Sequence, residues 1–173
     1  MTITVRPAEP ADAPALAAAL ARNRAYMRPW EPRRPADYYT AGTQLARITA
    51  PGSRLWLAVD GPAARVVAGA TLSGIALGPF RSASLGYWVD AEYTGHGLAT
   101  RLVGAVCRAA REELGLHRVE AGTVLTNTAS QRVLAKSGFQ RIGTAPRYLH
   151  IDGEWRDHHL FQRILHDDPP PEG

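Results

Sequence analysis

Cysteine, lysine and long apolar runs are all scarce in this sequence. Cys107 is its one cysteine, so no disulfide can form within the chain. No segment approaches the roughly 18 consecutive apolar residues that a membrane-spanning helix needs. The first residues also lack the charged and then apolar plan of a signal peptide. We therefore expect a cytoplasmic protein with no membrane segment.

The chain also has little net charge and no grouping of metal ligands. Its formal net charge of +4 is too small and too scattered to indicate direct binding to nucleic acid. Lysine occurs only at Lys136, whereas lysine and arginine together number 20. His158 and His159 are adjacent and would point to opposite faces of a strand, with no cysteine cluster beside them. We therefore expect no metal site.

The length of 173 residues and the hydrophobic content of 45% are typical of one globular domain. We expect that domain at residues 1–166 and a polar, proline-rich, disordered tail at 167–173. Hydrophobic periodicity predicts helices at 10–24, 36–48, 98–114 and 129–137, and strands at 3–6, 55–59, 66–72, 83–89, 117–125, 139–151 and 155–165. This order predicts an α+β fold, with helices flanking a mixed, mostly antiparallel twisted sheet.

Two glycines open the third predicted helix, in the segment Gly95-His96-Gly97-Leu98-Ala99-Thr100. The first turn of a helix leaves about four backbone N–H groups unpaired and carries roughly half a positive charge, so it favours a bound anion. Because glycine has no Cβ, phosphate oxygens can approach these amides closely. The alternative is a plain turn between a strand and a helix.

Two familiar phosphate-binding motifs do not fit this turn. A Walker A loop needs a Gly-Lys-Ser/Thr sequence, and the one lysine lies elsewhere. A dinucleotide fingerprint needs glycine or alanine at the position of Thr100 and an acidic residue about 20 positions further on. Glu112 and Glu113 come too early and fall within the predicted helix. The sequence therefore favours neither nucleotide hydrolysis nor hydride transfer.

A second block begins about 30 residues later, with Asn127-Thr128-Ala129-Ser130 followed by Lys136-Ser137-Gly138-Phe139. The glycine turn resembles the acetyl-CoA signature Gln/Arg-x-x-Gly-x-Gly/Ala of the GCN5-related N-acetyltransferase (GNAT) superfamily, and this block resembles its second conserved block. Arg28-Pro29-Trp30 and the segment 152–158 resemble the ribosomal-protein N-terminal (RimJ/RimL-type) subgroup. The resemblance covers about residues 3–165 and implies the GNAT acyl-CoA N-acyltransferase fold.

The resemblance also implies acetyl-CoA as co-substrate, with direct transfer of its acetyl group to an amine and no acyl-enzyme. The family's usual glutamine or arginine before the turn is Thr94 here, so we expect backbone amides to carry most of the phosphate binding. The expected cofactor contacts are Trp88, Val89, Thr94, Gly95, His96, Gly97, Leu98, Ala99, Thr100, Asn127 and Ser130.

Three residues are expected to take part in catalysis. Ser130 would protonate the leaving thiolate; alternatively, its hydroxyl bonds only to its own helix. Asn127 is a favoured N-cap residue and would also contact the cofactor arm. Glu120 would act as the base through a water molecule; alternatively, it is a surface glutamate paired with Arg118 or Arg141.

The acceptor is open between two kinds of amine. A protein α-amine has a pKa near 8, against about 10.4 for lysine, so an N-terminal acceptor, such as that of a ribosomal protein, needs only modest help from a base. The alternative is a small-molecule amine such as an antibiotic, a polyamine or an amino acid. We expect the loops 26–36 and 146–156 to decide, with four aromatic residues that line the acceptor site or belong to the core: Tyr26, Trp30, Tyr87 and Tyr148.

A hypothesis from another class is a non-catalytic acetyl-CoA sensor. The presence of Asn127 and Ser130 counts against it, because a binding module needs no acid for a thiolate. Dimers are common among proteins of this kind, so a homodimer is compatible with the resemblance, although no sequence feature indicates an interface.

Overall fold

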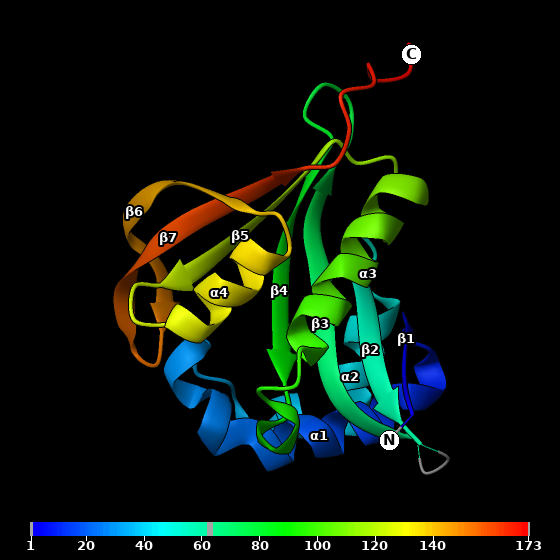
Figure 1. Cartoon of the computed structure of the whole chain (residues 1–173). Coiled ribbons are helices and arrows are strands. Elements are labelled where there is room, and N and C mark those ends of the chain that lie inside the picture. The colour runs from blue at the N-terminus through cyan, green and yellow to red at the C-terminus, as the bar shows by residue number, and fades with distance from the viewer. Residues whose placement is uncertain (1, 62–63, 173) are drawn as a thin grey trace.

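The computed structural model describes residues 2–61 and 64–172, and its elements follow the predicted order (Figure 1). The strands are β1 (Ile3–Pro7), β2 (Arg54–Asp60), β3 (Arg65–Ala76), β4 (Ser82–Val89), β5 (Arg118–Val124), β6 (Gln140–Ile151) and β7 (Glu154–Ile164). The α-helices are α1 (Ala13–Met27), α2 (Ala41–Thr49), α3 (Leu98–Glu112) and α4 (Thr128–Lys136). Short 3-10 helices are η1 (Pro10–Asp12), η2 (Arg28–Trp30), η3 (Ala36–Tyr39) and η4 (Ala91–Tyr93).

The strands form one sheet in the order β1-β2-β3-β4-β5-β7-β6, in which every neighbouring pair is antiparallel except β4 and β5. The β4–β5 pairing is short, because it joins only Ser82–Ser84 to Arg118–Glu120. Beyond that point the two strands separate, and β5, β7 and β6 swing away from the line of β4 (Figure 1). The sheet is therefore opened along the second half of β4. The predicted fold class is confirmed.

Helices cover both faces of this sheet. One cluster of buried side chains lies between the sheet and α3, with Leu102, Val103 and Val106 at its centre. A second cluster lies on the opposite face, where Leu16 and Leu20 of α1 meet β2 and β3. Figure 1 shows α3 and α4 in front of the sheet and α1 and α2 behind it. No helix among the described residues is long and apolar enough to cross a membrane.

The helix boundaries differ from the predicted ones near proline and threonine. The helix expected at 36–48 is two elements, because Thr40 has an extended backbone and its hydroxyl accepts the N–H of Thr43 as the N-cap of α2. The loop expected from Tyr26 starts later, since α1 continues to the buried Met27 and ends before Pro29. At the other end of the chain, residues 165–172 follow β7 without regular secondary structure. Disorder at 167–173 stays a prediction, and Gly173 lies outside the described residues.

Candidate active site

The glycine turn forms the N-terminus of α3. Gly95 and Gly97 have φ angles of +80° and +76°, the left-handed region that favours glycine. A Cβ added at either position would meet no atom within 4 Å. No side chain caps α3, since its N-cap is Gly97 itself. The first amides of α3 therefore have no side-chain cap, and the space beside both glycines is open, which is the arrangement expected of a phosphate-binding turn.

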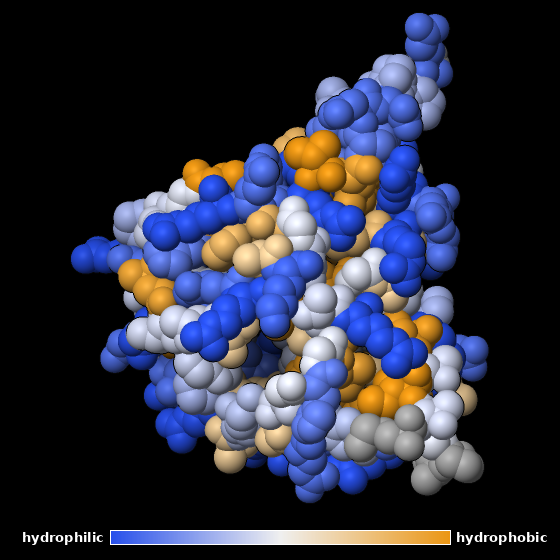
Figure 2. Space-filling view, viewed as in Figure 1, coloured by the Kyte–Doolittle hydropathy of each residue, from blue (hydrophilic) through white to orange (hydrophobic). Residues whose placement is uncertain are grey.

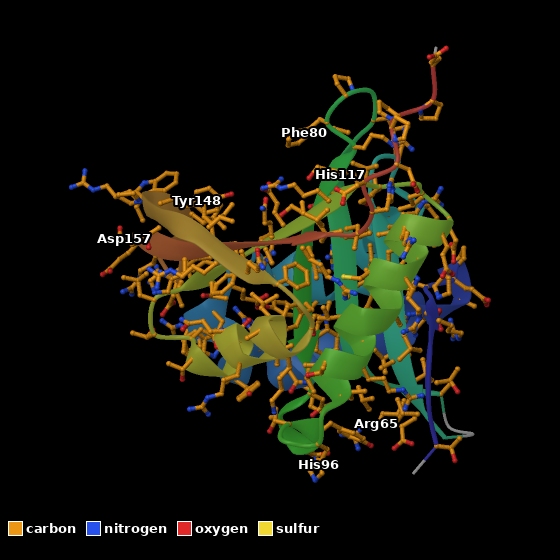
Figure 3. The ribbon with its side chains drawn as sticks, turned by 45° about the horizontal axis from the view of Figure 1, so that its top comes forward. Arg65, Phe80, His96, His117, Tyr148 and Asp157 are labelled. Atoms are coloured by element: carbon orange, nitrogen blue, oxygen red, sulfur yellow. The ribbon has the colours of Figure 1, made fainter. Side chains whose placement is uncertain are left out.

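Side chains of the turn differ in their positions. The cavity described below is lined by Thr94, Gly95 and Gly97, and by the start of α3 at Leu98, Ala99 and Thr100. The Thr94 hydroxyl donates to the carbonyl of Ala91 at 3.0 Å, so it serves the local turn. His96 is exposed at the tip of the turn (Figure 3) and does not line the cavity. Backbone amides are thus the groups that this turn offers to a phosphate.

Asn127 and Ser130 are held together at the start of α4. The side-chain oxygen of Asn127 accepts the backbone N–H of Ser130 at 3.1 Å, which confirms Asn127 as an N-cap. The Ser130 hydroxyl oxygen lies 2.6 Å from the phenol oxygen of Tyr87, and the phenol also lies 3.2 Å from the Ser130 carbonyl. Burial raises the pKa of Tyr87 to about 12, against a smaller lowering by the Ser130 bond. The serine is therefore paired with a phenol that stays protonated at neutral pH.

Alternation along β4 places Tyr87 and Trp88 on opposite faces of the sheet. Tyr87 packs with the cluster on the α3 side, and Trp88 packs with the cluster on the α1 side. The Trp88 indole lies across Gly69 of β3, where an added Cβ would be 2.7 Å from the indole nitrogen. Because Gly69 has no side chain, the Trp88 indole can pack directly against β3. Of the aromatic residues expected at the acceptor site, Tyr87 instead contacts Ser130 on the α3 and α4 side.

Backbone amides of β4 also face the opening in the sheet. The N–H of Asp90 donates to the carbonyl of Val67 in the direction of β3. Because successive amides of a strand alternate in direction, the N–H of Trp88 also points toward β3, and those of Val89 and Tyr87 point toward β5. Within the described chain, the β4–β5 pairing ends at Ser84. The amides of Tyr87 and Val89 are therefore the ones open to a ligand, whereas Trp88 contributes its side chain.

One cavity of about 920 Å³ passes through this opening. On the α3 and α4 side it is lined by the glycine turn, Asn127 and Ser130, and past β4 it reaches side chains from α1, the following loop and α2. Figure 2 shows a recess in the surface beside α4 and the start of α3. On the far side the lining includes Tyr26 and Trp30, as expected, together with three charged residues: Glu31, Arg34 and Arg47. The cavity thus joins the phosphate-binding turn to a separate, charged end.

Two residues expected at the site lie elsewhere. Glu120 pairs with Arg118 at 2.8 Å, as in the structural alternative, and does not line the cavity. Arg118 also donates to Gln162 at 2.6 Å, so the pair belongs to a cluster on the sheet. Tyr148 is exposed on β6 beside His158, far from the glycine turn (Figure 3). These positions favour structural roles for both residues.

The three residues at the charged end of the cavity were not predicted from the sequence. Glu31 directly follows the Arg28-Pro29-Trp30 segment, which was the available signal, but Arg34 and Arg47 resemble ordinary surface arginines in sequence. No group of three or more histidine, cysteine, aspartate or glutamate side chains that could hold a metal ion occurs at residues 2–61 or 64–172.

Comparison with known proteins identifies the family. Residues 2–140 match the acetyltransferase (GNAT) domain. The chain is 35% identical to a probable N-acetyltransferase, YjcK, of Bacillus subtilis, over 96% of both chains. It is 33% identical to the [ribosomal protein uS5]-alanine N-acetyltransferase of Escherichia coli, over 91% of this chain and 85% of that protein.

Solved structures agree with this fold. The ribosomal-protein-S5-alanine acetyltransferase of Vibrio fischeri superposes with a TM-score of 0.92 at 31% identity, over 99% of this chain and 97% of that one. RimJ of Mycobacterium smegmatis, solved in complex with CoA-disulfide, has a TM-score of 0.83 at 28% identity, over 94% and 81%. A spermidine N-acetyltransferase of Vibrio cholerae, at 20% identity with a TM-score of 0.78 over 94% of this chain and 95% of that one, shares the fold. The chain belongs to the GNAT acetyltransferase family and is an acetyl-CoA-dependent N-acetyltransferase similar to the ribosomal-protein-alanine enzymes.

Proposed function

We propose that this enzyme acetylates the N-terminal α-amine of a protein. The observation that carries the proposal is the cavity that runs through the sheet from the glycine turn to the charged end beyond β4. Such a passage lets a coenzyme and an acceptor enter from opposite faces and meet beside β4. The similarity to ribosomal-protein-alanine acetyltransferases over most of the chain supports a protein terminus, and a ribosomal protein in particular.

A second cavity supports an extended acceptor. It measures about 460 Å³ and is lined by Trp30, Leu125 and Trp155, among others. Trp30 lines both cavities, so the second lies directly beside the acceptor end of the first. A polypeptide that places its first residue in the main cavity has room here for the residues that follow, whereas a small amine would leave this surface unused.

The coenzyme supplies an acetyl thioester, and the residues of the chain assist its transfer. The amides of the glycine turn hold the pyrophosphate, and those of Tyr87 and Val89 donate to the pantetheine arm and to the carbonyl oxygen of the thioester. A donor aimed at the developing oxyanion is worth about 3 kcal/mol. Asn127 fixes the position of Ser130 through its cap.

In the proposed reaction the leaving thiolate gains one proton and the attacking amine loses one. The neutral amine attacks the thioester carbon, the C–N bond forms and the C–S bond breaks. Ser130 donates its proton to the leaving thiolate and is reprotonated by water, or by Tyr87, which then takes a proton from solvent. The proton of the attacking amine passes to solvent. Glu120 stays a prediction as the base, but its pairing with Arg118 gives that role no support.

The proposal is tested by release of free thiol from acetyl-CoA. The acceptors are short peptides that begin with Ala, Ser or Met, the same peptides with a blocked N-terminus, spermidine and an aminoglycoside. We expect turnover of free peptides and none of blocked ones. Turnover of a small amine alone would replace the protein acceptor with a small-molecule one. Coenzyme binding without turnover of any amine would contradict the enzyme and favour a sensor. A cytoplasmic location and a homodimer stay predictions.

A further inference from the structure

The acceptor end of the cavity carries charges of both signs that do not pair with one another. Glu31, Arg34 and Arg47 all line it. None of the ion pairs within 4.0 Å in the described part of the chain includes Glu31. Burial raises the pKa of Glu31, while Arg34 and Arg47 act through space in the opposite direction. A half-buried carboxylate thus faces the cavity without a hydrogen-bond partner.

Arg34 also lacks a partner. Its Nε is buried and makes no hydrogen bond within the described residues. The neighbouring Arg28 and Arg33 differ, because both form ion pairs with Asp152 in the turn between β6 and β7, at 3.0 and 3.7 Å. A buried guanidinium donor without an acceptor is unfavourable by itself. Among these loop arginines, Arg34 is the one left to bind a ligand.

The two cavity arginines are held in place by buried residues. The guanidinium groups of Arg34 and Arg47 lie 4.5 and 5.0 Å from the centre of the Tyr38 ring. Arg47 also donates to the side-chain oxygen of Gln44 at 2.6 Å, and Gln44 is fully buried and bonds in turn to the carbonyl of Tyr38. The positive groups are therefore positioned before any acceptor binds, which lowers the entropy lost on binding.

Glu31 is positioned by a separate contact. Its backbone carbonyl accepts the N–H of Asp152 at 3.1 Å, so the acceptor loop is tied to the β6–β7 turn at this residue. The carboxylate is thereby held on the same cavity as the two arginines but apart from them. Unpaired charges of opposite sign in one cavity fit a ligand that carries both signs itself.

We propose that these residues form an acceptor subsite for an amine with a carboxylate close to it. This inference rests on the proposed N-terminal acetylation and adds its specificity. Glu31 binds the ammonium form of the N-terminus before it loses its proton, and Arg34 and Arg47 bind the acidic side chain of the second or third residue. A polyamine carries only positive charge, so the two arginines repel it.

Matched peptides test this subsite in the unmodified enzyme. Three peptides that begin with Ala differ only in their second and third residues, which are Glu, Gln or Lys, and kcat/KM is measured for each by thiol release. We expect the Glu peptide to exceed the Gln peptide by about tenfold, because an acidic group gains a charge-assisted hydrogen bond. The Lys peptide should fall below both. Equal kcat/KM for Glu and Gln peptides would overturn the subsite while leaving N-terminal acetylation intact.

Variants separate the two proposals. Arg34→Gln and Arg47→Gln should each lower kcat/KM for the Glu peptide more than for the Gln peptide, chiefly through KM. Arg33→Gln is the matched control, because Arg33 is exposed and forms an ion pair with Asp152, and it should keep the wild-type ratio. If no peptide reacts but free glutamate does, the protein acceptor fails and the carboxylate subsite holds. Turnover of spermidine alone would overturn both.

Discussion

The hydroxyl of Ser130 lies 2.6 Å from the phenol oxygen of Tyr87, although the two residues are 43 positions apart. Ser130 is brought there by the first turn of α4, and Tyr87 by the part of β4 that has left β5. A serine whose proton can be replaced by a buried, protonated phenol is suited to give that proton to a thiolate.

Removing the serine hydroxyl tests this pair. Ser130→Ala should lower kcat by about a hundredfold, the usual scale for a lost general acid, and change the Kd for acetyl-CoA by less than about threefold. Steady-state kinetics and a coenzyme titration measure the two effects separately. An unchanged kcat would exclude Ser130 as the acid.

Tyr87→Phe should lower kcat by a smaller factor, about tenfold, because water can then reprotonate the serine. The double variant should be no slower than Ser130→Ala alone, since residues that act as a unit are not additive. Two independent, multiplying effects would contradict a shared role. With a pKa raised to about 12, Tyr87 in the wild type should cause no loss of activity between pH 7 and pH 10.

The glycine turn predicts a loss of coenzyme affinity in Gly97→Val. An added Cβ would meet no atom of the protein within 4 Å. We therefore expect the side chain to occupy the space assigned to the pyrophosphate, and the Kd for acetyl-CoA to rise at least about tenfold. A positive φ also costs a branched residue roughly 1–2 kcal/mol of stability. Gly52→Val controls for that strain, because Gly52 has a φ of +77° in the turn between α2 and β2. Equal Kd values in both variants would remove the turn from the binding site.

Local sequence signals predicted the turn and the helix cap of this site, but not the contacts between residues that are far apart in the sequence. The glycines at 95 and 97, and the cap at Asn127, follow from backbone rules that act within a few residues. The structure has Gly97 at the start of α3, as predicted, and Asn127 as the N-cap of α4. The Tyr87–Ser130 contact depends on how the fold places the first turn of α4 beside β4, which no local pattern encodes.

The same limit explains the residues that were missed or lie elsewhere. Arg34 and Arg47 come from a loop and from α2, and only the fold brings them onto one tyrosine ring. Glu120 is on the strand beside β4, as expected, but it pairs with Arg118 two residues earlier, on the same face of the strand. Alternation could therefore have favoured that pair over a role in the cavity.

Replacing Gly69 with alanine should destabilise the fold, because the new methyl group would clash with the Trp88 indole. In Gly69→Ala the new methyl group would lie 2.7 Å from the indole nitrogen, so the ring must move. We expect the free energy of unfolding in urea to fall by about 1–3 kcal/mol, the usual range for overpacking. Gly86→Ala on the adjacent strand β4 is the control, because no atom lies within 4 Å of its added Cβ. Equal stability of the two variants would show that Trp88 has room to adjust.

The buried carboxylate of Asp90 should make the free energy of unfolding depend on pH in the acid range. Its buried carboxylate accepts two bonds from Arg22 of α1, at 2.9 and 2.5 Å, and one from the backbone of Glu92 at 3.1 Å. Burial raises the pKa of Asp90, but these hydrogen bonds outweigh it, and the pKa lies below its ordinary value. The ionised form is thus favoured by folding, at the point where β4 leads into the glycine turn.

A depressed pKa stabilises the fold above the unfolded value of about 3.9, and this contribution is lost as the pH falls through the lower folded value. Asp90→Asn should therefore lower the free energy of unfolding at pH 7 by about 1–3 kcal/mol, because the charge-assisted hydrogen bonds from the partly exposed Arg22 are lost. The variant should also lose less stability than the wild type between pH 5 and pH 2, measured by urea unfolding at each pH. Glu92→Gln removes an exposed partner of Arg65 and should change stability by less than about 1 kcal/mol. Parallel pH profiles for wild type and Asp90→Asn would mean that other carboxylates, and not the buried Asp90, set the acid sensitivity of the fold.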